Sequence, residues 1–140
     1  REFPKTSALE SPYRAYRAIV DKRYPEPMDD SRRDAMTALW MRATGYTIQD
    51  AANELFQKAR PPRKEKERRD WRRYARETAR YAFTVPGDID IAAASLTQEQ
   101  IARFTREAEQ TEAAFIAAEK ARTAEAEREQ ARSAPGLRMR

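Results

Sequence analysis

Residues 60–83, RPPRKEKERRDWRRYARETARYAF, decide the fold, because a proline-broken basic run here leads into a helix with two opposed faces. At about 100° per residue, one face gathers aromatic and small side chains. These are Trp71, Tyr74, Ala75, Thr78 and Ala82. The opposite face holds a row of arginines within an arc of about 100°. This arginine row comprises Arg69, Arg72, Arg73, Arg76 and Arg80. We expect the aromatic face to be buried and the arginine row to lie at the surface.

The positive charge of the chain is concentrated in this stretch. From Arg60 to Arg80 there are ten basic and four acidic residues, an excess of six positive charges. The whole chain carries +5, so the remainder sums to −1. Asp70 and Glu77 fall off the arginine arc, so we expect little to neutralise the row. Such a row favours an anionic partner, since planar guanidinium groups pair well with phosphates.

We therefore predict contacts to the backbone of single-stranded DNA, tolerant of sequence because no constellation that reads bases is present. The alternatives left open are a solvated helix face and a surface that binds protein. Tyr13, Tyr46 and Tyr81 could stack on bases, although core or partial burial is the favoured interpretation for each. The predicted phosphate-binding residues are Arg63, Lys64, Lys66, Arg69, Arg72, Arg73, Arg76 and Arg80.

The composition favours helices throughout. Only three glycines and few β-branched residues are present, while Ala, Glu and Arg are abundant. The predicted fold is all-α: a small four-helix bundle-like domain followed by a long, partly solvent-exposed C-terminal helix. The expected divisions are a leader or linker at 1–10, the helical bundle at 11–96, the long helix at 97–133 and a flexible basic tail at 134–140.

Capping signals set the expected helix boundaries. Pro25, Gly45 and Pro61 should end the first three helices. The fourth is expected from about Lys66 to Phe83, and the fifth could run to about Ser133. The predicted N-terminal signals are Ser11 with Pro12, Ser31 with Asp34, Thr47 with Asp50, and Thr97 with Gln100.

Apolar spacing predicts which faces are buried. In the second helix the expected stripe is Met36, Leu39, Trp40 and Ala43. In the third it is Ile48, Ala51, Ala52, Leu55, Phe56 and Ala59. In the fifth it is Ile101, Phe104, Ala108, Thr111, Phe115 and Ala118, after which the series meets Arg122 and the packing signal fades. The long helix should therefore extend beyond the core.

Catalysis is not expected from these residues. The chain has no Cys and no His, which removes thiol nucleophiles, imidazole bases and the usual zinc ligands. The acidic pairs at 29–30 and 88–90 lie beside helix starts, where carboxylates are favourable in any case. We expect no enzymatic activity, no cofactor or metal and no small-molecule substrate. The stretch 45–55, GYTIQDAANEL, is similar to the opening of a helix-turn-helix, but Pro61 and Pro62 stand where a recognition helix would have to run, so a structural helix is favoured.

The expected setting is the cytoplasm. The absence of Cys agrees with a reducing compartment, and no apolar run approaches the roughly 20 residues that span a bilayer, so membrane insertion is not expected. Because the chain opens with Arg1 rather than Met, we expect it to be a piece of a longer protein.

Short motifs on the predicted helices carry a family resemblance. They are YRAY at 13–16, SRRDAM at 31–36, MRATG at 41–45, RDW at 69–71, YAR at 74–76 and TARY at 78–81. In this order they resemble the helix-bundle domain that follows the catalytic domain in RepB-type plasmid primases. Similar segments occur in relaxase–primase mobilisation proteins of conjugative plasmids. The likeness covers about residues 11–83.

The resemblance implies an accessory domain that assists template engagement and initiation on single-stranded DNA. The polymerising carboxylates of such primases lie in the preceding domain. The long helix after Thr97 departs from the family pattern, and the resemblance implies no role for it. The closing residues 138–140 look like the basic C-terminal signals of type IV secretion substrates, so an alternative function is protein docking or secretion recruitment through residues 97–140. The partner there would be a secretion or replication protein.

Overall fold

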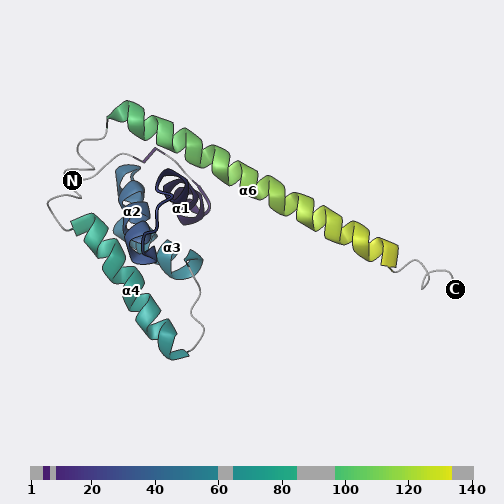
Figure 1. Cartoon of the computed structure of the whole chain (residues 1–140), viewed down its shortest axis with the longest axis horizontal. Helices are drawn as coiled ribbons and strands as arrows, with labels where there is room; N and C mark the ends of the chain where they lie inside the picture. The colour runs from purple at the N-terminus through teal and green to yellow at the C-terminus, as the bar shows by residue number, and fades with distance from the viewer. Residues whose placement is uncertain (1–4, 7–8, 60–64, 85–96, 134–140) are drawn as a thin grey trace.

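The computed structural model describes residues 5–6, 9–59, 65–84 and 97–133, with the side chains of 65–69 excepted. Within these residues the chain forms helices and no strand. The helices are α1 (Pro12–Arg23), α2 (Asp30–Ala43), α3 (Ile48–Lys58), α4 (Glu65–Thr84) and α6 (Gln98–Ser133). The prediction of an all-α fold with a long C-terminal helix is confirmed (Figure 1).

Helices α1 to α4 make a compact body, and α6 runs along one side of it and continues well beyond (Figure 1). Helix α4 packs on α2 and α3, while α1 packs on α2 and also contacts α6. The core between them is built from fully buried Tyr16, Ile19, Met41, Leu55 and Phe104. Helix α4 is thus held on one side of the body, away from α6 in Figure 1.

Local capping explains most helix boundaries. Ser11 is the N-cap of α1 with Pro12 at the first helical position, and Thr47 with Asp50 forms the predicted capping box of α3. Gly45 has φ 92°, a left-handed conformation that a residue without Cβ adopts at no steric cost. The amides of Gly45 and Tyr46 donate to the carbonyls of residues 42 and 41, which makes the predicted C-terminal cap of α2 a Schellman motif.

The start of α2 and its buried face differ from the prediction. Asp29, not Ser31, is the N-cap, so Asp34 is not a capping residue. The buried stripe runs through Asp34, Thr37, Ala38 and Met41, whereas three of the four predicted residues are only half-buried and Ala43 alone is buried. Hydrophobic spacing missed this face because two of its positions are polar. Asp34 accepts a hydrogen bond from Tyr13, and Thr37 donates one to the carbonyl of Arg33, so both polar side chains are satisfied inside the core.

Helix α6 begins as predicted and leaves the core as predicted. Thr97 and Gln100 bond reciprocally to each other's backbone amides. Phe104 and Ala108 are fully buried, but Ala118, expected in the stripe, is exposed. From residue 116 to 133 every side chain except that of Ala124 is exposed. No helix in the described part of the chain is sufficiently long and apolar to cross a membrane.

Candidate nucleic-acid interface

The aromatic and small face of α4 is turned inward, as predicted. Ala75, Ala79 and Ala82 are at most 1% exposed, and Trp71 and Tyr74 are half-buried. The two aromatic rings stack with centroids 4.9 Å apart. This face therefore fixes the rotation of α4 about its own axis.

Three polar contacts reinforce that rotation. Tyr74 Oη donates to Asp34 Oδ2 of α2 at 2.6 Å, and Trp71 Nε1 donates to the carbonyl of Phe56 of α3 at 3.2 Å. Near the other end, buried Arg42 of α2 donates from Nη1 to the carbonyl of Ala82 at 3.2 Å. Helix α4 is thus tied to two neighbours along most of its length.

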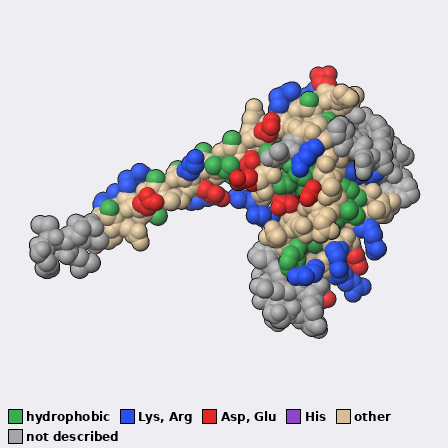
Figure 2. All heavy atoms as spheres, turned by 180° about the vertical axis from the view of Figure 1, so that it is seen from behind, with side chains coloured by type: hydrophobic (Ala, Val, Ile, Leu, Met, Phe, Trp, Pro, Cys, Tyr) green, Lys and Arg blue, Asp and Glu red, His purple; other side chains and the backbone are tan. Residues whose placement is uncertain are grey.

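The opposite face carries the predicted arginine row at the surface. Arg72, Arg73, Arg76 and Arg80 are all exposed. Figure 2 shows Lys and Arg side chains gathered on the lower right of the body, where α4 lies when Figure 1 is turned about its vertical axis. Of the other predicted phosphate-binding residues, Lys66 and Arg69 lie in α4 with side chains outside the description, and Arg63 and Lys64 lie outside the described residues.

Two members of the row have neighbours that the sequence pattern did not reveal. Arg73 Nε lies 3.2 Å from Glu77 Oε1, so the expectation that Glu77 would leave the row alone is wrong for this arginine. Both side chains are more than half exposed, so the pair contributes little stability and competes weakly with another anion. The guanidinium of Arg72 lies over the ring of Phe56 with its carbon 4.8 Å from the ring centroid.

The guanidinium groups of Arg76 and Arg80 form no hydrogen bond or ion pair with any group that the structure describes. Together with Arg73 they line a groove of about 540 Å³ between α4 and the N-terminal half of α3. We call this the α3–α4 groove. Its lining is Ile48, Gln49, Ala52, Arg73, Arg76, Glu77 and Arg80. Three cations and one carboxylate give it a net positive charge.

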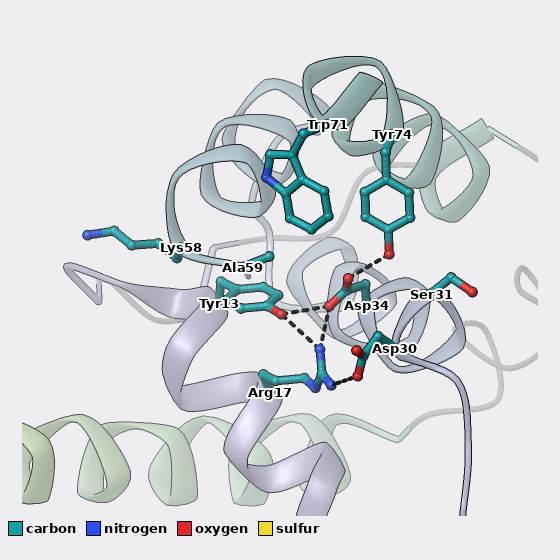
Figure 3. A pocket seen from close by; sticks show the side chains of 9 residues that line it. All are labelled: Tyr13, Arg17, Asp30, Ser31, Asp34, Lys58, Ala59, Trp71 and Tyr74. Atoms are coloured by element: carbon teal, nitrogen blue, oxygen red, sulfur yellow. Dashed lines mark hydrogen bonds and ion pairs between the residues drawn. The ribbon is translucent and has the colours of Figure 1, made fainter. Parts of the chain in front are cut away.

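Sequence reasoning missed the buried polar cluster that supports α4. Asp34 is 2% exposed and accepts hydrogen bonds of 2.6 Å from Tyr13 Oη, Tyr74 Oη and Arg17 Nη1 (Figure 3). Burial, together with the hydrogen bond to Asp34, raises the pKa of both tyrosine hydroxyls well above their ordinary value of 10.0. No local pattern signals this cluster, because its members come from α1, α2 and α4.

A second hollow, of about 350 Å³, opens beside this cluster. Of the side chains around it, those of Tyr13, Arg17, Asp34 and Tyr74 point toward one another from three helices, whereas Lys58 of α3 points away (Figure 3). Arg17 is shared among Asp21, Asp30 and Asp34 at 3.0, 2.8 and 2.6 Å, so each of these carboxylates has a cationic partner within the chain. The pair at 29–30 therefore supplies a partner for Arg17, and within the described residues no cluster suited to a metal ion occurs. The pair at 88–90 lies outside the described residues.

Comparison with known proteins bears on the segment that carries this interface. Residues 28–82 match the family model of the RepB DNA-primase C-terminal helical domain. The resemblance to RepB-type primases is confirmed. A DNA primase from Acidithiobacillus ferrooxidans is 37% identical over 78 residues, which is 56% of this chain and 22% of that protein. No solved structure matches the chain.

The matched segment contains α2, α3 and most of α4, and therefore both walls of the α3–α4 groove. It ends before α6 and begins after α1, which supplies Tyr13 and Arg17 to the Asp34 cluster. The chain spans about a fifth of the length of the curated relative.

The three tyrosines considered for base stacking differ in how far they are buried. Tyr13 and Tyr46 are 5% and 7% exposed and belong to the core, as favoured from the sequence. Tyr81 is 50% exposed on α4, so its ring lies outside the core and is only partly covered. The 45–55 stretch makes the turn after α2 and most of α3, whose Ala51 and Leu55 are fully buried, so it builds the bundle.

Proposed function

We propose that this chain is a non-catalytic accessory domain of a plasmid replication or mobilisation primase, and that it holds the backbone of single-stranded DNA. One observation carries the proposal: the exposed arginines on a single face of α4, inside the segment that matches a primase domain. The predicted linker cations and the arginine row are the proposed contacts. Among them, Arg73, Arg76 and Arg80 line the α3–α4 groove.

Electrostatics support a polyanion as the partner. The guanidinium groups of Arg76 and Arg80 are without described partners, and Arg73 has only an exposed carboxylate beside it. Guanidinium groups bind phosphate oxygens through paired hydrogen bonds, and each neutralised phosphate releases counterions. Binding of this kind is strong at low salt and weak in sequence preference, which suits a domain that engages template wherever priming occurs. Such a domain would work in the cytoplasm.

The non-catalytic part of the proposal follows from the chemistry available. The chain contains no His or Cys, and Asp30 and Asp34 of α2 pair with Arg17. A primase that uses this domain would therefore carry its polymerising site elsewhere. A primer-synthesis assay on this chain alone, with magnesium and nucleotides, should give no product.

A charge-reversal experiment tests DNA binding. The variant Arg73→Glu/Arg76→Glu/Arg80→Glu should bind a labelled single-stranded oligonucleotide at least about tenfold more weakly in fluorescence anisotropy. The matched control reverses three exposed arginines of α6, Arg103, Arg106 and Arg122. Each Arg→Glu substitution removes one positive charge and adds one negative charge, so both triple variants lower the net charge by six. If both variants lost affinity for the oligonucleotide to the same extent, the total charge of the chain, and not the arginine row of α4, would govern binding.

A second candidate function is favoured by the free half of α6. This helix continues past the body, and its side chains from 116 to 133 are exposed apart from Ala124 (Figure 1). It would act as a docking or type IV secretion recruitment surface of a conjugative relaxase–primase. Deleting residues 121–140 should then abolish partner capture or conjugative transfer and leave DNA affinity intact. If the deletion alters neither, this candidate is wrong.

A further inference from the structure

We propose, resting on the function above, that the α3–α4 groove is a single-strand channel in which α3 forms the second wall. The phosphates of one extended strand lie on Arg73, Arg76 and Arg80, and its sugars and base edges lie against Ile48 and Ala52. This assigns binding residues to α3 and makes the site selective for single strands over duplex.

The cationic wall is a row of three arginines that runs along α4. Arg73, Arg76 and Arg80 share one face of α4 and line the same groove. With a rise of 1.5 Å per residue, they follow one another at about 4.5 and 6 Å along the helix axis. Arginine side chains are long and carry a planar fork that pairs with phosphate oxygens, so at these spacings neighbouring arginines can each take one phosphate of an extended strand. The groove volume of about 540 Å³ is that of a small-ligand site and admits a few nucleotides.

The apolar wall is unusual for a surface beside three arginines. Ile48 belongs to the predicted buried stripe of α3 but is 39% exposed, at the first position of the helix. Ala52, one turn later, is half-buried on the same wall. A free phosphate ion would gain nothing from these side chains. An extended nucleic-acid strand has an anionic edge and an apolar edge side by side, which matches the two walls.

This arrangement explains why a duplex should bind less well. In a duplex the bases face the opposite strand and are stacked inside the double helix, so only phosphates and sugars reach a protein groove of this kind. The contacts of base edges to Ile48 and Ala52 would be lost, while those of phosphates to the arginines would remain. The apolar wall should therefore set strand selectivity, and the arginine wall should set salt dependence.

Gln49 offers a test that leaves the arginines in place. Its side chain is exposed, lies in the first turn of α3 and bonds Asn53 at 3.3 Å. A carboxylate in a first helical turn is favourable for the helix, so Gln49→Glu should fold normally while adding repulsion inside the groove. Gln57→Glu is the matched control, exposed on α3 and absent from the groove. We expect Gln49→Glu to weaken binding of a twenty-nucleotide oligothymidylate by about tenfold, with Gln57→Glu near wild type.

Ile48 tests the selectivity. Ile48→Ala should lower the ratio of oligothymidylate to hairpin-duplex affinity by about fivefold and leave the salt dependence unchanged. Ile116→Ala is the control, since Ile116 is 38% exposed on α6 and so matches Ile48 in exposure. Circular dichroism of all four variants checks that the helices are intact.

The outcomes separate this inference from the proposed function. If reversal of the three arginines weakens binding but Gln49→Glu and Ile48→Ala behave as their controls do, the channel is wrong and the function stands. Equal wild-type affinity for single strand and duplex also overturns the channel. If the wild-type chain binds neither oligonucleotide, both the function and the channel are wrong.

Discussion

The hydroxyl of Tyr74 on α4 lies 2.6 Å from Oδ2 of Asp34 on α2, a carboxylate that is 2% exposed. The same carboxylate accepts from Tyr13 on α1 through its other oxygen, so one buried charge joins three helices. Hydrogen bonds offset the desolvation penalty of a buried carboxylate. When one partner is removed, part of that penalty is no longer offset and the folded state is destabilised. The position of the arginine face therefore depends on this contact.

Replacing Tyr74 by phenylalanine should lower the free energy of unfolding by about 1–3 kcal/mol, because a hydrogen bond to a buried charged group is lost. Urea unfolding followed by circular dichroism measures this. Tyr81→Phe is the control on the same helix, since Tyr81 is 50% exposed and its change should stay within about 0.5 kcal/mol. Equal effects of the two substitutions would show that the hydroxyl of Tyr74 does not hold α4.

The Asp34 cluster should also make the fold sensitive to alkaline pH. Burial and the hydrogen bond to Asp34 raise the folded-state pKa of Tyr13 and Tyr74 above the ordinary 10.0. As pH rises past 10, the unfolded chain loses these protons while the folded chain keeps them, so ionisation favours unfolding. The stabilisation is thus complete below about pH 10 and declines above it. The difference in free energy of unfolding between wild type and Tyr74→Phe should decrease from about pH 8 to about pH 11 in urea titrations. A difference that stays constant over this range would contradict the raised pKa of Tyr74.

Phe104 should be the residue that docks α6 on the bundle. Its ring is fully buried, stacks on Trp40 of α2 with centroids 3.9 Å apart, and meets Tyr16 of α1 edge-on at 4.7 Å. Phe104→Ala should cost about 3–5 kcal/mol of unfolding free energy and speed amide exchange in residues 98–115. Phe115→Ala is the control, because this half-buried ring contacts Arg14 at the surface. If Phe115→Ala lowered the free energy of unfolding as much as Phe104→Ala does, the contacts that hold α6 on the bundle would not be concentrated at Phe104.

Local signals made much of this fold predictable. Thr47 with Asp50, Thr97 with Gln100 and the glycine at 45 act through atoms a few residues apart, so their sequence patterns determine the geometry. The two faces of α4 are likewise a consequence of helical periodicity alone. The family resemblance was recognisable for the same reason, since its motifs are spacings on helices.

The features that sequence patterns missed depend on contacts between distant parts of the chain. Asp34 looked like a capping residue because its partners Tyr13 and Tyr74 are 21 and 40 positions away. Ile48 looked like a core residue because spacing cannot tell where a neighbouring helix stops covering α3. The groove combines this exposed end of α3 with α4, which only the packed structure brings together.

The salt dependence of single-strand binding tests the central claim most directly. Oligothymidylate affinity of the wild type and of Arg73→Glu/Arg76→Glu/Arg80→Glu should be measured by anisotropy from low to high sodium chloride. With about 0.7 counterions released per phosphate contact, loss of three contacts should reduce the slope of log affinity against log salt by about 2. The α6 triple at Arg103, Arg106 and Arg122 should keep the wild-type slope. An unchanged slope and affinity in the α4 variant would contradict the proposal that its arginines hold phosphates.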